Sequence, residues 1–229
     1  MEPKAKFRHM IKSIVYSNAF VYELSMKLSK LSQLLRGKHK YTINHKGYGW
    51  IKKDIEGQGH CIQINKGCVL KGTTFHIRGN NNRIVFEENC IVGEKCSFWM
   101  EGDNISIVIG SGSTFTHTVH FCAQENDVSI LVGKDCMFSN NIIVRTSDSH
   151  PIYDLQSGMR MNPPRDVKIG EHVWIAPNTK IMKGAVVGNG AIIGSDTIVT
   201  KCIPEDSLAV GHPAKVVKQG IKWTRERLY

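Results

Sequence analysis

The feature of this sequence that most constrains its fold is an aliphatic side chain at every sixth position near the C-terminus. The run comprises Ile169, Ile175, Ile181, Val187, Ile193 and Val199. A small residue follows most of them, at Gly170, Ala176, Gly188 and Gly194. Helices repeat every 3.6 residues and strands every two, so neither element alone gives a period of six.

The same period occurs further upstream in groups of three. These groups are Phe86, Val92 and Phe98; Ile109, Phe115 and Phe121; and Val132, Phe138 and Val144. Between groups the register slips by 10 to 11 residues instead of six, at the segments RGNNNR, EGDN and AQEND. Glycine, asparagine and aspartate favour turns, so each slip indicates a longer loop at a corner.

This pattern predicts an all-β solenoid. Each short strand points one aliphatic side chain inward, a small residue allows a sharp corner, and three sides make a coil of about eighteen residues. Loops inserted at corners cost little because their ends stay fixed. We expect a basic helical extension and lead-in at 1–58, the solenoid at 59–203 with an excursion loop at 147–166, and a C-terminal tail at 204–229.

Positive charge is concentrated at the N-terminus. Residues 1–40 hold nine basic and two acidic side chains, against a formal net charge of +10 for the whole chain. Apolar residues in this segment recur about every 3.5 positions, which predicts one or two amphipathic helices. Such a helix would pack on the rest of the protein or a sister subunit, or make peripheral contact with an anionic membrane surface. No nucleic-acid recognition motif is present, so nucleic acid is not an expected partner.

Several classes of protein are disfavoured. No apolar run approaches the ~18 residues of a membrane-spanning helix, and the N-terminus lacks a secretory signal, so we expect a cytoplasmic protein, peripheral to the inner face of the membrane if residues 1–40 bind lipid. The seven cysteines are odd in number and have no CxxC pair. The histidines form no HExxH motif, so neither a disulfide framework nor a metal site is expected.

The hexads from 167 to 202, followed by IPEDSLAVGHPAKVVK at 203–218, resemble the hexapeptide-repeat acyltransferases. The resemblance covers residues 60–218 and lies nearest the polysialic-acid and capsular polysaccharide O-acetyltransferases. It implies a left-handed parallel β-helix, a homotrimer with active sites between subunits, and transfer of an acetyl group from acetyl-CoA. The handedness comes from the resemblance alone, since general connection rules favour right-handed crossovers.

The rhythm of sixes fails at His150, where counting on from Val144 would place a core aliphatic. The chain then continues as HPIYDLQSGMRMNPPRD, whose prolines and glycine prevent regular structure. The segment TSDSHPIYD resembles the part of sugar O-acetyltransferases that carries the catalytic histidine. Imidazole titrates near neutral pH and can remove the proton of a hydroxyl as that hydroxyl attacks a thioester, so we expect His150 to be the general base of a ternary-complex mechanism.

Three further residues are candidate contacts to the acceptor substrate. Asp148 and Asp154 lie close enough in sequence to orient the His150 ring or touch substrate, or they cap turns. His120 precedes an inward residue and so points outward, where it lines the same cleft or is an ordinary surface residue.

Trp174 precedes the inward Ile175, so its ring faces outward and needs a partner. It follows His150 by 24 residues. In the branch that HVWI resembles, a tryptophan at a similar interval lies in the active site, where its ring would hold the thioester end of CoA. The alternative is packing in a trimer interface.

The CoA site is expected along the C-terminal coils. Ala176, Gly194 and Ser195 are small enough for a pantetheine arm to lie over them, although corners of the fold also demand small residues. Lys201, Lys215 and Lys218 offer charges for the CoA phosphates, or belong to a solvated basic tail.

Three functions are compatible with the sequence. The leading one is acetyl-CoA-dependent O-acetylation of a cell-surface polysaccharide or its sugar precursor. The second is N-acetylation of an amino sugar on a nucleotide carrier or of a small antibiotic. The third is a non-catalytic scaffold or sugar-binding module, because a fold alone does not fix a function.

Overall fold

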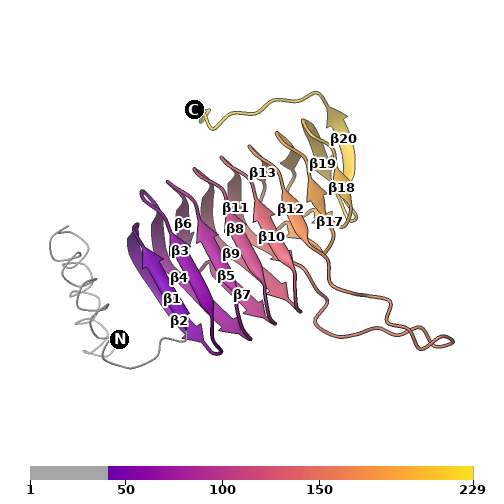
Figure 1. The fold of residues 1–229 in the computed structure, drawn as a ribbon. Coiled ribbons are helices and arrows are strands. Elements are labelled where there is room, and N and C mark those ends of the chain that lie inside the picture. Colours follow the sequence, from indigo (N-terminus) through magenta and orange to yellow (C-terminus); the bar gives the residue numbers. More distant parts are fainter. Residues whose placement is uncertain (1–40, 229) are drawn as a thin grey trace, which may run out of the picture. The chain divides into compact units, whose positions relative to one another are not determined.

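The computed structural model describes residues 41–228, which form a β-solenoid of stacked three-sided coils (Figure 1). The amphipathic helices predicted within residues 1–40 lie outside the described residues. The part of the chain that is described contains no helix long and apolar enough to cross a membrane.

One side of the solenoid, here called side 1, is an eight-stranded sheet. Its strands, in the order in which they pair, are β1 (Tyr41–His45), β3 (His60–Ile64), β5 (Arg83–Phe86), β8 (Ser106–Ile109), β10 (Ser129–Val132), β12 (Val167–Ile169), β15 (Val186–Val187) and β18 (Cys202–Ile203).

A twelve-stranded sheet forms the other two sides. Its long strands bend around a corner and belong to both sides: β2 (Tyr48–Ile55), β4 (Val69–Arg78), β9 (Thr114–Gln124) and β11 (Met137–Arg145). Side 2 also contains β6 (Ile91–Glu94), β13 (Trp174–Ile175), β16 (Ile192–Ile193), β19 (Ser207–Val210) and β20 (Lys215–Gln219). Side 3 also contains β7 (Ser97–Glu101), β14 (Lys180–Ile181) and β17 (Ile198–Val199).

Parallel pairing stacks equivalent residues of successive coils above one another. Phe98 pairs with Phe121, and their rings stack at a centroid distance of 4.9 Å and an angle of 3°. Every hexad residue named above is buried, and together they form one continuous core. The predicted fold class, a solenoid of hexapeptide repeats, is confirmed.

The polar segments at which the hexad register slips form a ladder at the corner between sides 3 and 1. Asn104 and Asp127 both have positive φ, 57° and 58°, and Asn104 Nδ2 donates to Asp127 Oδ1 at 2.9 Å. Asparagine and aspartate tolerate this left-handed conformation and bond laterally to the next coil, which explains why they occur at each slip.

The solenoid extends beyond the predicted limits of 59 and 203 at both ends. It begins with β1 and β2, which pair in parallel with β3 and β4, and its last parallel strand is β19. At the N-terminal end, the exposed side chains of Lys52, Lys53 and Asp54 obscure the hexad pattern. Backbone hydrogen bonds to the next coil form regardless of side-chain polarity, so these strands join the sheets.

Two segments leave the regular coils. Residues 147–166, here called the arm, project from the solenoid between β11 and β12 (Figure 1). Residues 220–228, here called the strap, follow the antiparallel strand β20 and run back along the outside of the coils. The arm bears the candidate site residues Asp148, His150 and Asp154.

Candidate active site

His150 lies at the base of the arm, at the corner where the chain passes from side 3 to side 1. Its side chain is exposed, and among residues 41–228 no group forms a hydrogen bond with its imidazole ring. Its backbone carbonyl accepts a hydrogen bond of 2.9 Å from Asn162 Nδ2. The main chain at His150 is therefore fixed while the ring remains open to a substrate.

Asn162 joins the two halves of the arm's base. Its side chain is 8% exposed, its Oδ1 accepts the Ile152 N–H at 2.7 Å, and its Nδ2 also donates to Asp148 Oδ2 at 2.9 Å. A buried amide with all of these partners stabilises one geometry, because each alternative would leave polar atoms unpaired.

Asp148 supports the arm through Lys183, whose ammonium donates to Asp148 Oδ2 at 2.5 Å and to Asn162 O at 3.1 Å. The hydrogen bond from Lys183, followed by that from Asn162, lowers the pKa of the Asp148 carboxyl. Among residues 41–228, the Asp148 carboxylate thus bonds to residues that fix the arm and not to the His150 ring.

A second attachment joins the arm to the preceding coil through Glu125. The carboxylate accepts two hydrogen bonds from the Arg160 guanidinium, at 2.6 and 2.9 Å, and one from Ser147 Oγ at 2.5 Å. The Arg160 hydrogen bond is the main cause of the lowered pKa of Glu125. Paired, bidentate contacts of this kind are among the stronger polar interactions in proteins.

Asp154 lies near the tip of the arm, beyond the bridge between Tyr153 and Arg160. Its Oδ1 accepts the N–H groups of Gln156 and Ser157 and the Ser157 hydroxyl, at 3.1, 2.7 and 2.8 Å. These bonds, led by those from Ser157, lower the pKa of Asp154. The contacts are those of a turn cap, one of the two alternatives left open by the sequence.

Trp174 lies on the outer surface of side 2, between Met137 of β11 and Ile192 of β16. The half-buried ring has a partner in the same chain, because the Trp223 ring of the strap lies 6.0 Å away at 48°. The outward orientation expected from the alternation along the strand is thus observed.

One chain does not bring His150 and Trp174 together. The arm leaves at the corner between sides 3 and 1, whereas β13 belongs to side 2, which is the side opposite that corner. Within one chain, the two residues therefore do not form a common site.

The corner between sides 2 and 3 holds most of the residues predicted to bind CoA. Ala176 and Gly194 occupy the same place in successive coils, and Lys215 pairs with Val210 beyond them. A Cβ added to Gly194 would lie 2.6 Å from Val210 Cγ1, so glycine at this position leaves room for the Val210 side chain of the next coil. Ser195 is exposed beside this column.

The other predicted residues lie apart from this column. Lys201 is exposed at the corner that carries the arm, and Lys218 is exposed on side 2, paired with Leu208. His120 lies on side 3, where its Nδ1 is 2.7 Å from Ser97 Oγ. Burial lowers the pKa of His120, which favours its neutral form.

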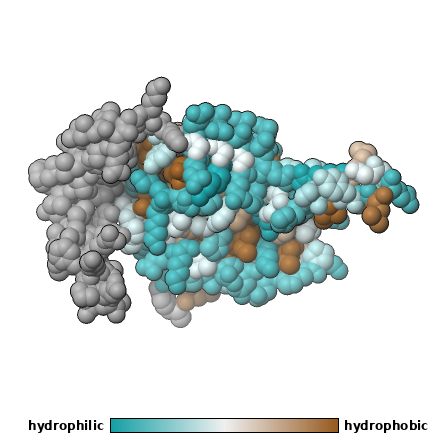
Figure 2. Space-filling model, turned by 90° about the horizontal axis from the view of Figure 1, so that it is seen from below, coloured by the Kyte–Doolittle hydropathy of each residue, from teal (hydrophilic) through white to brown (hydrophobic). Residues whose placement is uncertain are grey.

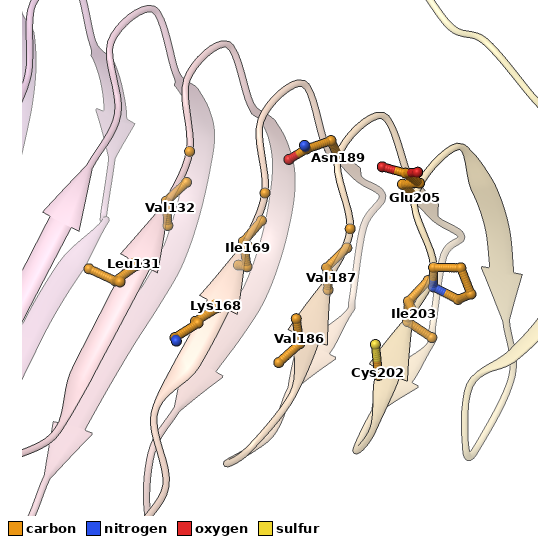
Figure 3. Close-up of a pocket in the computed structure, with 14 residues that line it drawn as sticks. Leu131, Val132, Lys168, Ile169, Val186, Val187, Asn189, Cys202, Ile203 and Glu205 are labelled. Carbon is orange, nitrogen blue, oxygen red and sulfur yellow. The ribbon is translucent and has the colours of Figure 1, made fainter.

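Side 1 carries a shallow groove of about 530 Å³ (Figure 3). Leu131, Val186 and Cys202 present aliphatic or thiol surface along it, with Lys168 between them. A Cβ added to Gly188 would lie 2.3 Å from Glu205 N, so glycine at this turn allows the backbone of the next coil to approach closely. None of the predicted site residues lines it.

Except for Asp148, the residues that fix the arm are absent from the predicted site. Lys183 is 35 residues from Asp148 in sequence and carries no local signal of that contact. Glu125 lies in one of the turn segments, and Asn162 precedes a pair of prolines, so both resemble ordinary loop residues. Trp223, a large aromatic in a polar tail, was the one visible signal for the strap.

Comparisons with known proteins agree with this fold. The family model described as bacterial transferase hexapeptide (six repeats) matches residues 166–201. A polysialic acid O-acetyltransferase of Neisseria meningitidis is 31% identical over 180 residues, which is 75% of this chain and 79% of the relative. The chain belongs to the hexapeptide-repeat acyltransferase family.

Other members of the hexapeptide-repeat family match over different lengths. A polysialic acid O-acetyltransferase of Escherichia coli O1:K1 / APEC is 40% identical over 90 residues, but the match spans only 29% of that relative. Among solved structures, the polySia-specific acetyltransferase NeuO gives a TM-score of 0.63 at 28% identity, covering 82% of this chain and 91% of that one. The polysialic acid O-acetyltransferase OatWY gives 0.54 at 26% identity, covering 83% and 94%.

Proposed function

We propose that this hexapeptide-repeat protein is an acetyl-CoA-dependent O-acetyltransferase acting on a cell-surface polysaccharide or its sugar precursor. The observation that carries the proposal is the setting of His150, whose main chain is fixed by Asn162 while its ring is exposed and unpaired among residues 41–228. The names of the Neisseria relative and of the structural neighbours NeuO and OatWY support a glycan as the acceptor.

In the proposed reaction, His150 acts as general base. It removes the proton of a sugar hydroxyl while the oxygen attacks the thioester carbonyl carbon. The tetrahedral intermediate then collapses, the bond from carbon to sulfur breaks, and the imidazolium returns its proton to the departing CoA thiolate. Acetyl passes directly between two substrates bound together, and the enzyme forms no covalent intermediate.

Trp174 and the column of Ala176, Gly194 and Lys215 would hold the donor. The small side chains of this corner, with Ser195 exposed, would leave room for pantetheine, and the ring of Trp174 lies at the start of the same strand that ends at this corner. An aromatic face beside the thioester would pack on the acyl end, and the indole N–H can donate a hydrogen bond.

Because His150 and Trp174 lie on opposite parts of the coil, we propose that a second copy completes the site, as in a homotrimer. The arm supports this. Figure 2 shows hydrophobic surface on the projecting segment. Its exposed large apolar side chains are Ile152, Tyr153, Leu155, Met159 and Met161. Such a surface is typical of a contact between subunits.

The first test is acetyl-CoA turnover, followed by release of free thiol, against acidic and neutral capsular oligosaccharides, amino-sugar nucleotides and chloramphenicol. We expect turnover on a glycan that survives chemical blocking of amines and disappears in His150→Ala. Turnover on amines alone would favour an N-acetyltransferase. Full activity in the variant would remove His150 from the mechanism, and failure to bind acetyl-CoA would favour a non-catalytic module.

A further inference from the structure

We propose that Trp223 of the strap is a positioning residue for Trp174, a role that rests on the function proposed above. The indole of Trp223 is 6% exposed, although it belongs to a tail that is otherwise almost entirely exposed. A large apolar ring buried by such a tail indicates a specific docking contact rather than chance proximity.

Trp223 is held by the corner that immediately precedes β13. Its ring stacks on the His172 imidazole at a centroid distance of 4.0 Å and an angle of 8°. Its Nε1–H donates to His172 O at 2.9 Å, and its own carbonyl oxygen lies 3.1 Å from His172 Nε2. Two hydrogen bonds and a ring stack thus hold Trp223 against His172, which is two residues before Trp174.

The rest of the strap also fixes this corner, through contacts with the preceding coils. His172 Nδ1 lies 2.6 Å from Asp135 Oδ2, and Arg225 Nε donates to Asp135 Oδ1 at 2.7 Å. Arg225 also donates to Cys136 O at 2.9 Å and to Thr114 Oγ1 at 3.0 Å. The strap therefore crosses three coils and holds Trp223 independently of its contact with Trp174.

The direction of approach explains how Trp223 would act. It contacts Trp174 from the corner that precedes β13, whereas Ala176 and Gly194 lie at the corner that follows it. Trp223 thus contacts the Trp174 ring from the side opposite the column proposed for pantetheine. Without that contact the Trp174 ring can rotate toward the vacated space, and its face and N–H lose a fixed direction.

The experiment compares kcat and KM for acetyl-CoA in the full chain carrying Trp223→Ala, Trp223→Phe or Trp174→Ala, and the Trp223→Ala/Trp174→Ala pair. We expect Trp223→Ala to lower kcat/KM about tenfold, the order of effect of losing one well-packed aromatic pair. Trp223→Phe, which keeps a ring on His172, should recover most of the activity. In the Trp174→Ala background the same substitution should change kcat/KM less than twofold, because its effect acts through Trp174.

Thr224→Ala is the matched control, since this neighbouring side chain is exposed, and it should match the unmodified protein. An unchanged kcat/KM in Trp223→Ala would overturn the assignment, and so would a loss of equal size in the Trp174→Ala background, which would indicate a general structural role. CoA binding by calorimetry is measured in parallel. If the unmodified protein binds no CoA, the proposed function itself fails, and this assignment fails with it.

Discussion

The division of the site between two chains can be tested by mixing two variants, each of which lacks one of the two residues and has strongly reduced activity. His150→Ala removes the proposed base and leaves side 2 intact, whereas Trp174→Ala alters side 2 and leaves the arm intact. The arm and β13 belong to different parts of the coil, so each variant should fold normally. If one copy supplies His150 and its neighbour supplies Trp174, a mixed oligomer contains some sites in which both residues are native.

The size of the recovery follows from closed symmetry. In a trimer that holds both kinds of chain, whether two to one or one to two, a single interface joins a native His150 to a native Trp174. Mixed trimers should therefore show about one third of the unmodified activity, and mixed dimers would show about one half.

The two variants would be co-expressed with different affinity tags and purified through both tags in turn, so that every oligomer is mixed. Thiol release from acetyl-CoA with the accepted glycan then gives the activity per chain, and light scattering gives the mass of the assembly. Activity no greater than that of the single variants would refute a site shared between chains. Each variant measured alone supplies the background.

Three further predictions concern the arm and the core. Lys183→Met keeps most of the side-chain volume but removes the ammonium that bonds to Asp148, so it should lower kcat about three- to tenfold and speed proteolysis of the arm, with little change in KM for acetyl-CoA. Folding lowers the pKa values of the Asp148 and Glu125 carboxyls, so these groups stabilise the arm at pH values above the ordinary carboxyl pKa, and this stabilisation is lost as the pH falls through the lowered pKa values. Proteolysis of the unmodified arm should therefore accelerate below about pH 4. An arm equally protected at pH 7 and pH 3 would contradict this. Phe98→Ala should reduce the free energy of unfolding by roughly 3–5 kcal/mol, measured by urea denaturation, because it opens a cavity beside the Phe121 ring, whereas Phe98→Leu should cost clearly less; equal losses in the two would argue against a cavity effect.

The sequence by itself determined the solenoid, because its signal is local and repeated. Each hexad residue such as Ile175 or Val187 fills the same slot in its coil, and all of these slots are buried as the period requires. The break in the period likewise located the arm and put His150 at its base. At the N-terminal end the pattern fails, since Lys52 and Lys53 lie on β2, whose pairing with β4 depends on backbone hydrogen bonds rather than on side-chain polarity.

Only the tertiary structure decided which residues support the site. Asp148 bonds to Lys183, which is 35 residues away, and Trp223 packs on His172, which is 51 residues away, so neither contact leaves a periodic trace in the sequence. The placement of His150 at a corner and of Trp174 on side 2 also follows from how the coil closes in three dimensions, not from their spacing in sequence. Repeated local patterns specify how a coil folds, whereas contacts made once between distant segments depend on where stacking brings those segments together.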